Sequence, residues 1–413
     1  MGKDDKKNKK ILFIQPTITH MAGIDMAIMP IINELSQIEN VKISTLSIFE
    51  KFETLKSFEN GAINYTLNES LKNIDKENKI KKIHKMLVRS YKFYKFICNK
   101  NFDCIICSGD GLSISLSFTI LILKKINSKA NTVFISYMHE NLKNISGINK
   151  RILRKVLPKF DKVICVSEGL RQSIDNYINC KGEDVKSIVL YNTFVKSDKL
   201  QMRIKAFNNK TFLAVGRLEK VKGNTDLIKA FIKFKSKLEL VQIDKSKNEI
   251  VLEIIGDGNE REELEKLIAE NNAEEFIKLL GHRDREFIYE KLATAYAFIN
   301  NSKMETFGVS LLEAMSIGVP LIINNCEFGP AEICEQDRAI YLNVSDDAKK
   351  IRVFDYGIMC EEGNVESLAQ ALGLICEDDI YNSFDTNKEI IRAEEFSKSK
   401  IVAKWKELFI EVD

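Results

Sequence analysis

Two glutamates, Glu305 and Glu313, stand eight positions apart in the stretch NSKMETFGVSLLEAMSIGVP, residues 301–320. Between them, Phe307-Gly308 precedes apolar residues at helical spacing, so a helix is predicted to begin here. The start of a helix carries free N–H groups and partial positive charge, and it therefore attracts anions. The spacing predicts an anion site with one carboxylate before it and the other inside the helix.

Two cations follow a predicted strand earlier in the chain. In VGRLEKVKG, residues 215–223, Arg217 and Lys222 stand five positions apart. Arginine forks onto phosphate oxygens and lysine acts as a compact charge, so the pair could neutralise a diphosphate without a metal. Solvated surface cations are the alternative interpretation, but the position after a strand favours binding. Combined with the two glutamates, the pattern suits a ligand with phosphate in its middle and hydroxyl-rich groups at both ends.

Four further residues are candidates, and three of them have a structural alternative. His139 ends a strand in ISYMHEN, where a histidine is either a satisfied structural residue or part of a site. Asp110, in CSGDGLS, is either a turn residue or a contact for a second substrate. Gly23 begins a predicted helix and permits close approach of a phosphate. Glu332, after Gly-Pro in CEFGPAEI, either caps a helix or holds a hydroxyl group.

The elements that must position these residues alternate between strand and helix, as in a doubly wound parallel sheet. The first half has predicted strands at 11–16, 41–49, 104–107, 132–138, 162–167 and 187–191, and helices near 24–38, 79–100, 112–126, 149–157 and 168–179. After a polar linker, strands are predicted at 211–216, 250–256, 276–281, 296–302 and 320–325, and helices near 223–238, 259–271, 284–293, 307–317, 364–377 and 384–411. Ligands of such sheets bind at the carboxyl ends of the strands, where the candidates lie.

Length and composition favour two soluble domains. The chain has 413 residues, 45% of them hydrophobic, and lacks any run of eighteen apolar residues or a signal-peptide core. Residues 1–200 hold 33 Lys/Arg and 20 Asp/Glu, a balance of +13, whereas residues 201–413 hold 29 and 39, a balance of −10. The N-terminal half is therefore expected to meet an anionic partner. Nine scattered cysteines, with Cys104 and Cys107 inside an apolar strand, indicate buried thiols and a reducing cytoplasm.

The segment KIKKIHKMLVRSYKFYKFICNK, residues 79–100, has eight Lys/Arg and no acid, interleaved with apolar and aromatic residues. One interpretation is a helix that faces the core and has a solvated basic side. The other is an interfacial helix that rests on anionic lipid. Nucleic acid binding is a weaker third interpretation, because no nucleic-acid motif accompanies the segment.

Several motifs together resemble a known family. VGRLEKVKG, IIGDG (254–258), LLGH (279–282) and NNSKMETFGVSLLEAMSIGVP resemble the C-terminal domain of the retaining glycosyltransferases of family 4, which have the GT-B fold. Glu305 and Glu313 match the E-x7-E pair that is the most specific mark of this family. The resemblance is strong over about 211–334 and weaker in the first half. There the loop QPTITHMAGIDMA has Ala22 in place of a glycine and Met26 in place of an arginine.

The resemblance implies a role for each matched residue. Arg217 and Lys222 would bind the donor diphosphate, and Glu305 would orient the transferred sugar. Glu313 would accept hydrogen bonds from the ribose diol. Further implied contacts are the backbone N–H groups of Phe307, Gly308 and Val309 to phosphate or sugar, Gly281 and His282 beside the nucleobase, and His139 on the donor sugar or the acceptor.

The resemblance also implies the architecture, which is two facing Rossmann-like domains with a cleft between them and a C-terminal helix that crosses back. We expect an acceptor-side domain at 1–200, a nucleotide-sugar-binding domain at 201–383, and the returning helix at 384–413.

The implied activity is that of a retaining hexosyltransferase of class EC 2.4. It would move sugar from a nucleotide diphosphate sugar, with UDP favoured, to a glycan or lipid-linked acceptor in bacterial surface polysaccharide synthesis. No metal or other cofactor and no nucleic acid partner are expected. The expected place is the cytoplasm, peripheral to an anionic membrane surface. The alternatives are a nucleotide-sugar epimerase, a phosphorylase, or a non-catalytic nucleotide-sugar-binding subunit.

Overall fold

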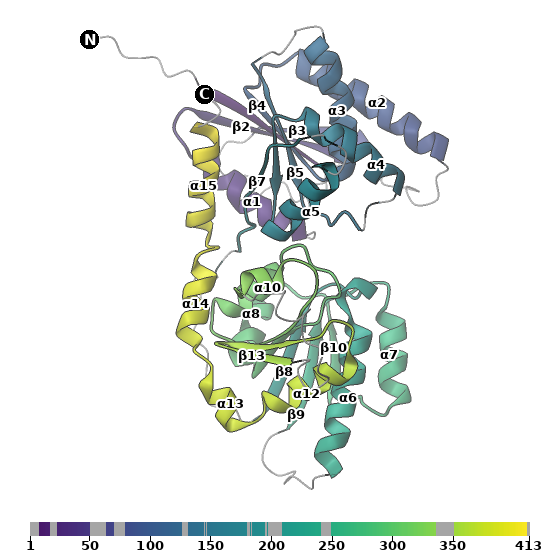
Figure 1. Ribbon diagram of the computed structural model, residues 1–413, viewed down its shortest axis with the longest axis vertical. Helices are drawn as coiled ribbons and strands as arrows, with labels where there is room; N and C mark the ends of the chain where they lie inside the picture. The colour runs from purple at the N-terminus through teal and green to yellow at the C-terminus, as the bar shows by residue number, and fades with distance from the viewer. Residues whose placement is uncertain are drawn as a thin grey trace, which may run out of the picture. The chain divides into compact units, whose positions relative to one another are not determined.

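The structure is a computed structural model that describes residues 8–16, 23–49, 63–69, 79–125, 131–143, 145, 147–179, 182, 184–194, 196, 209–240, 249–335 and 351–410. The chain divides into two compact units. Unit 1 is Met1–Thr193 together with Lys398–Asp413, and unit 2 is Phe194–Ser397. Figure 1 shows the elements of both units.

Unit 1 is built on a parallel sheet, which has seven strands in its described part, in the order β3-β2-β1-β4-β5-β6-β7. The central strands are almost wholly buried and rich in Ile, Val and Phe, as expected of a sheet covered on both faces. The strands are β1 (Lys9–Gln15), β2 (Val41–Phe49), β3 (Ile63–Glu69), β4 (Cys104–Ser108), β5 (Val133–Met138), β6 (Lys162–Cys165) and β7 (Ser187–Val189).

Helices cover both faces of this sheet. Consecutive residues of β5 point to opposite faces, and they identify the covering helices. The Ser136 hydroxyl bonds that of Ser113 on α3 at 2.8 Å, whereas the Tyr137 ring lies 5.4 Å from the Trp405 ring on α15. The helices of unit 1 are α1 (Gly23–Leu35), α2 (Lys79–Cys98), α3 (Asp110–Lys125), α4 (Gly147–Val156), α5 (Glu168–Asn179) and α15 (Lys398–Ile410), with a 3-10 turn at Leu157–Lys159.

Unit 2 repeats this plan with one variation. Its described sheet has seven strands in the order β10-β9-β8-β11-β12-β14-β13, and β13 pairs antiparallel with β14. The strands are β8 (Lys210–Val215), β9 (Ile250–Ile255), β10 (Ile277–Gly281), β11 (Ala297–Asn300), β12 (Leu321–Asn324), β13 (Ile351–Phe354) and β14 (Gly357–Cys360). The helices are α6 (Asn224–Leu240), α7 (Arg261–Glu270), α8 (Arg285–Thr294), α9 (Val309–Met315), α10 (Pro330–Ile333), α12 (Val365–Leu374), α13 (Asp378–Ser383) and α14 (Thr386–Glu394), with a 3-10 turn at Lys220–Lys222.

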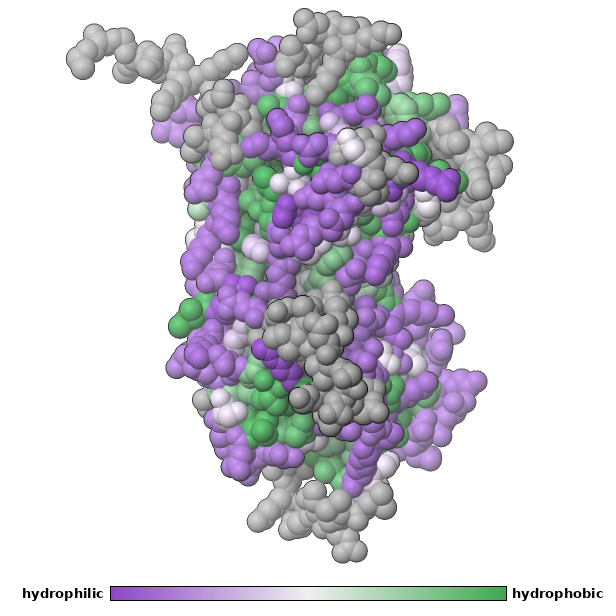
Figure 2. Space-filling view, in the orientation of Figure 1, coloured by the Kyte–Doolittle hydropathy of each residue, from purple (hydrophilic) through white to green (hydrophobic). Residues whose placement is uncertain are grey.

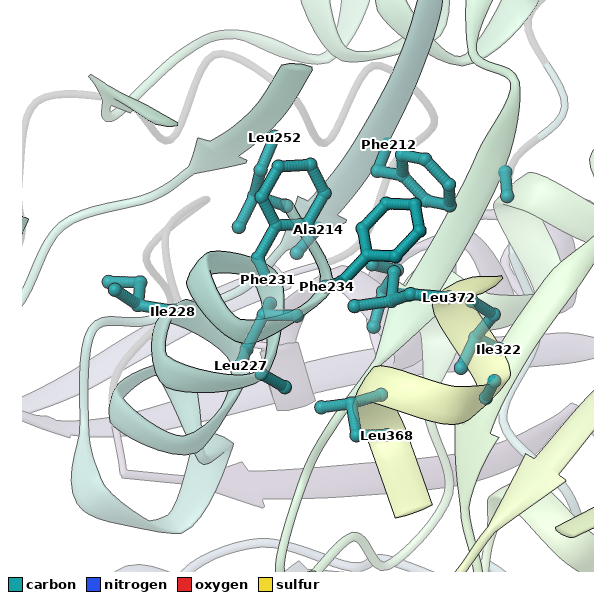
Figure 3. Close-up of a cluster of buried hydrophobic side chains, with 14 of the residues drawn as sticks. Phe212, Ala214, Leu227, Ile228, Phe231, Phe234, Leu252, Ile322, Leu368 and Leu372 are labelled. Carbon is teal, nitrogen blue, oxygen red and sulfur yellow. The ribbon is translucent and has the colours of Figure 1, made fainter. Parts of the chain in front are cut away.

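The core of unit 2 is a cluster of buried side chains from β8, α6, β9 and α12 (Figure 3). Phe212 is its centre and makes edge contacts with Phe231, Phe234 and Tyr296 at ring distances of 5.7 to 6.3 Å. Such aromatic pairs add about 0.5–1.5 kcal/mol each beyond the burial of apolar area. This rigid core holds the ends of β8 and β11 in place, and both strands lead into the candidate site.

Three features differ from the sequence prediction. Strand β3 was not predicted, because INYTLNE alternates apolar and polar residues and has no apolar run. The β13–β14 hairpin was not predicted either, because an alternation of strand and helix leaves no place for two strands joined by a turn. The single helix predicted over 384–411 is wrong, since the structure has α14 and α15 with a break between them. Phe396, in the break, packs its ring 5.7 Å from that of Phe307, and Ser397 forms a parallel bridge with Phe194.

Two other expectations concern thiols and membranes. Cys104 and Cys107 are buried in β4 as predicted, and burial raises the pKa of the Cys104 thiol to about 12. Among the described residues, every helix is too short or too polar to cross a bilayer. The face seen in Figure 2 is mainly hydrophilic, with separate hydrophobic areas over each unit.

Candidate functional site

The candidate site of unit 2 lies at the carboxyl ends of two neighbouring central strands. The strand order reverses direction at β8, which has β9 on one side and β11 on the other. In doubly wound sheets the loops at such a reversal splay apart and leave room for a ligand. The loop after β8 carries Arg217 and Lys222, and the loop after β11 carries Glu305. The fold therefore explains how residues more than eighty positions apart share one place.

The two loops are joined to each other by hydrogen bonds. The Asn301 side-chain amide donates to the Gly223 carbonyl at 2.7 Å, and the Lys303 N–H donates to the Val221 carbonyl at 2.8 Å. Gly223 has φ +68°, and a Cβ there would lie 2.3 Å from the Asn301 carbonyl oxygen. Only glycine fits this turn, which fixes where Lys222 stands.

Lys222 and Glu305 form the centre of the site. The Lys222 Nζ lies 2.5 Å from a carboxylate oxygen of Glu305, and both side chains are largely buried. The Ser302 hydroxyl donates to the same oxygen at 3.3 Å. The structure thus brings together the predicted cation and the first predicted carboxylate, and it places a hydroxyl beside them.

Arg217 is held differently. Its guanidinium pairs with Glu219 at 2.6 Å, and its side chain is 70% exposed. Of the two predicted cations, Lys222 is therefore the one in contact with Glu305. Arg217 stands at the exposed beginning of the same loop, where its long side chain can turn toward a bound anion.

Glu313 is buried within α9, and its side chain is only 10% exposed. Burial raises the pKa of its carboxyl group, and Arg285 opposes that change from 3.1 Å away. Tyr289, one turn along α8 from Arg285, has its own pKa raised by burial and by the Glu313 charge. Burial of a charged carboxylate costs free energy, which one cationic partner offsets only in part. The cost favours a role for Glu313 in binding.

The helix start between the two glutamates has the predicted form. Gly308 adopts φ +107°, a left-handed conformation, and α9 begins at Val309. Phe307 is buried and its ring packs against Phe396. The first N–H groups of a helix have no acceptor within the helix, so they face whatever lies before Val309.

The remaining candidates of unit 2 lie on other elements of the same unit. Gly281 ends β10, and its carbonyl accepts from the Gly256 N–H at 2.9 Å. His282 follows it and is exposed. Glu332 lies in the short helix α10, where the Arg392 guanidinium donates to its backbone carbonyl at 3.1 Å.

The candidates of unit 1 lie at the carboxyl end of that unit's sheet. Gly23 is the first residue of α1 and Asp110 the first residue of α3. His139 directly follows β5 and is 5% exposed, and neither of its ring nitrogens has a hydrogen-bond partner among the described residues. Burial lowers the pKa of His139 to about 3, so its imidazole is neutral at physiological pH. A neutral, buried imidazole can donate one hydrogen bond and accept another.

The sequence prediction missed four polar residues, two beside the candidates of unit 2 and two at strand ends of unit 1. Arg285 pairs with Glu313 in unit 2. The Asn224 amide nitrogen, at the start of α6, is buried with no hydrogen-bond partner in the part of the chain that the structure describes. Asn224 lines a cavity of about 20 Å³ beside Lys222, which is room for one water molecule. In unit 1 the side chains of Gln15 and Ser108 are also buried with no partner among the described residues. Gln15 is the last residue of β1 and Ser108 the last residue of β4, and the two strands are neighbours. Their position at a strand end was the sequence signal that could have identified them.

Within the described residues, no three His, Cys, Asp or Glu side chains come together in a way that could hold a metal ion. The candidate site of unit 2 instead offers two cations, two carboxylates and small polar groups. Such a set can bind a phosphate-bearing ligand with several hydroxyl groups.

Comparisons with known proteins agree with this chemistry. Residues 198–394 match the family described as Glycosyl transferases group 1. One relative, from Campylobacter jejuni, is an N-acetylgalactosamine-N,N'-diacetylbacillosaminyl-diphospho-undecaprenol 4-alpha-N-acetylgalactosaminyltransferase. It is 28% identical over 278 residues, and the match covers 66% of each chain, just under two thirds.

Solved structures share the fold of the whole chain. The apo form of the lipopolysaccharide outer core galactosyltransferase WaaB aligns with a TM-score of 0.70, covering 97% of this chain and 99% of that one at 17% identity. Anabaena Alr3699/HepE in complex with UDP and glucose aligns with a TM-score of 0.68, covering 98% and 100% at 17% identity. The fold is therefore GT-B, as predicted, and the comparisons support a glycosyltransferase as the enzyme class.

Proposed function

We propose that the chain is a retaining glycosyltransferase that takes a sugar from a nucleotide diphosphate sugar and transfers it to a glycan or lipid-linked acceptor. The observation that carries this proposal is the contact of Lys222 with Glu305 at the helix start before α9. A positive charge, a free helix start and a carboxylate at one point suit the junction of a diphosphate and a sugar. The match of residues 198–394 to group 1 glycosyl transferases supports it.

Each residue has a proposed task. Lys222, with Arg217 turned inward, stabilises the negative charge that grows on the leaving diphosphate. Glu305 accepts hydrogen bonds from hydroxyl groups of the transferred sugar, and Glu313 accepts them from the ribose diol. The backbone of 307–309 contacts phosphate or sugar, Gly281 and His282 lie beside the nucleobase, and Glu332 contacts the sugar. No metal is assigned a part.

The acceptor is assigned to unit 1, with Gly23, Asp110 and His139 as contacts. Transfer with retention needs the acceptor hydroxyl on the same face as the leaving group, so the departing diphosphate can take its proton. Catalysis then rests on positioning and on charge stabilisation. The name of the Campylobacter relative includes a diphospho-undecaprenol, which supports a lipid-linked acceptor at a membrane. We further propose that the chain acts at the cytoplasmic face of that membrane, in surface polysaccharide synthesis.

The direct test is a panel of UDP- and GDP-sugars with release of nucleoside diphosphate as the signal. Lys222→Met should lower kcat by about 10²–10³-fold, the usual effect of removing one transition-state donor. Lys303→Met is the matched control, because Lys303 lies on the neighbouring loop but pairs with Asp226 at 2.7 Å, and it should stay within a few fold of wild type. Product NMR should show the donor's anomeric configuration.

Three results would count against the proposal. Dependence on inorganic phosphate would indicate a phosphorylase, and a changed sugar still attached to its nucleotide would indicate an epimerase. If Glu305→Ala left cellular glycan intact while gene deletion abolished it, the chain would be a binding subunit.

A further inference from the structure

Exposed hydrophobic side chains are concentrated on two adjacent helices of unit 1. Of the nine large hydrophobic residues that are exposed in the described part of the chain, five lie on α2 and α3. They are between 38% and 65% exposed and comprise Leu87, Val88, Tyr91, Leu121 and Ile122. We call these five residues the α2–α3 surface.

The α2–α3 surface belongs to one packed pair of helices. The Ser90 hydroxyl donates to the Ser115 carbonyl, and the Thr119 hydroxyl donates to the Ser90 carbonyl, both at 2.8 Å. These two bonds join the middle of α2 to α3, and Figure 1 shows the helices side by side. Leu121 and Ile122 follow Thr119 within one helical turn, so the exposed apolar residues of α3 lie close in sequence to its contact with α2.

The core of unit 1 does not need the α2–α3 surface. Helix α2 turns Phe93 and Ile97 inward, and both are almost completely buried. Helix α3 does the same with Leu116 and Ile120. A helix with only a core face and a solvated basic face would have polar residues at 87, 88 and 91. The exposed apolar residues therefore indicate a second partner.

The charge around the surface identifies that partner. Lys85, Arg89, Lys92 and Lys95 lie on α2 among the exposed apolar residues, and α2 contains no acid. Helix α4, which packs against α3, adds an exposed Ile148 and the basic sequence NKRILRK at 149–155, in which Lys150 and Arg154 contact Tyr177. Apolar side chains flanked by lysine and arginine match a bilayer with anionic headgroups, where the apolar groups enter the interface and the cations meet the phosphates.

We propose that the α2–α3 surface docks unit 1 on an anionic lipid bilayer. The surface is described independently of the proposed function, but the reason for docking rests on that function, in which the acceptor is lipid-linked. The apolar residues insert into the interface of the bilayer. Each nearby cation contributes about 1 kcal/mol to the free energy of membrane binding, so removal of one cation weakens binding about fivefold. In the view of Figure 2, hydrophobic areas lie among hydrophilic ones over this part of unit 1.

The test is sedimentation of the full chain with phosphatidylglycerol vesicles and with phosphatidylcholine vesicles, at low and high salt. Wild type should bind the anionic vesicles, more weakly at high salt, and should leave the zwitterionic ones largely unbound. Leu87→Ser with Tyr91→Ser should abolish binding that survives high salt. Lys85→Gln with Lys92→Gln and Lys95→Gln should weaken binding at low salt about a hundredfold, three fivefold steps.

Matched controls come from unit 2. Ile391→Ser removes a hydrophobic residue that is 66% exposed, and Lys229→Gln removes an exposed cation, so both should bind vesicles like wild type. Equal binding by wild type and the α2–α3 variants would overturn the proposal. So would equal binding to both lipids, or a preference for single-stranded RNA over vesicles.

The same samples separate this inference from the proposed function. The α2–α3 variants should keep wild-type binding of UDP, because the donor residues lie in unit 2. A protein that binds anionic vesicles but releases nucleoside diphosphate from no donor would leave the docking surface standing and remove the transferase. A protein that releases nucleoside diphosphate but does not bind anionic vesicles would support the transferase and overturn the docking surface.

Discussion

At the scale of single residues, the candidate site of unit 2 contains charged side chains that are largely buried and paired with each other. Glu313 is a carboxylate inside the protein with Arg285 as its cationic partner. Lys222 and Glu305 likewise pair closely with limited access to water. In both cases a ligand with hydroxyl and phosphate groups can share the partners already present, so little must be desolvated when it binds.

Arg285→Gln tests this arrangement. Without the guanidinium, the pKa of Glu313 should rise further above the ordinary value for glutamate, because burial alone then acts on it. A carboxyl group with a raised folded-state pKa binds its proton more tightly when folded, so stability falls as pH rises from the ordinary value through the raised one. We expect urea unfolding to show a loss of about 1–3 kcal/mol at pH 8 and a smaller loss at pH 5.

The double variant Arg285→Gln with Glu313→Gln provides the control, and its loss of stability should be similar at both pH values. Nucleotide affinity should follow the same logic, with the ratio of wild type to Arg285→Gln changing between pH 5 and pH 8. Arg283→Gln serves as a neighbouring cation without this contact, since Arg283 donates to the Leu280 carbonyl. A pH-independent loss in Arg285→Gln would contradict this account.

The sequence was informative at this scale where spacing and strand ends coincide. The pairing of Lys222 with Glu305 follows from two loops at adjacent strand ends, and both residues were predicted. The contact of Arg285 with Glu313 was not predictable, because it depends on how α8 packs beside α9. The unpaired amides of Gln15 and Asn224 were hidden for a similar reason, since their burial depends on the surrounding fold.

At the scale of elements, α15 is the main external support of unit 1. Trp405, the only tryptophan of the chain, is fully buried and lies 6.0 Å from Phe13 and 5.4 Å from Tyr137 between ring centres. The Lys9 ammonium also bonds to the Phe409 carbonyl. The last helix therefore seals one face of a sheet whose strands come from the first half of the chain.

Trp405→Ala should destabilise unit 1 by about 3–5 kcal/mol, the usual cost of removing a buried large aromatic side chain. Trp405→Phe should cost less, because the indole N–H has no hydrogen-bond partner among the described residues and the ring contacts are partly kept. Lys404→Ala, one residue away and exposed, should change stability by less than about 0.5 kcal/mol. Urea unfolding followed by far-UV circular dichroism measures all three, and equal effects of the alanine variants at 404 and 405 would refute the assignment.

Sequence periodicity predicted the buried strands, whereas tertiary contacts determine where the last helices begin and end. The buried parallel strands β1, β4, β5, β8 and β9 were predicted from their apolar runs. The break between α14 and α15 was not, because residues 384–411 keep a helical pattern throughout. Phe396 and Ser397 leave the helix to contact Phe307 and Phe194, and these partners lie far away in sequence.

At the scale of the whole molecule, unit 2 is one continuous segment of the chain. In the sequence it is inserted between the two segments that form unit 1. The chain enters it at Phe194 and leaves it at Ser397, and these two residues pair with each other. Domains whose ends are close together tolerate excision and insertion well. The hydrophobic cluster around Phe212 is complete within this segment.

A fragment of residues 194–397 should therefore fold alone. It contains no tryptophan, so far-UV circular dichroism should show one cooperative thermal transition, and calorimetry should show UDP binding. Residues 1–193 alone should aggregate or stay partly unfolded, because α15 is missing from the sheet. Joining 1–193 to 398–413 through a short linker should restore a soluble unit, and failure of this rescue would show that unit 2 is needed for unit 1 to fold.

The pairing of Phe194 with Ser397 has a consequence for how such proteins diversify. Because both crossings of the chain lie at one point, a single exchange of residues 194–397 would replace the donor half without cutting any strand of the other sheet. If the proposed function and the proposed docking surface hold, a hybrid of this kind would keep the acceptor contacts and the α2–α3 surface while accepting a different donor sugar. Donor specificity and acceptor specificity would then be inherited separately.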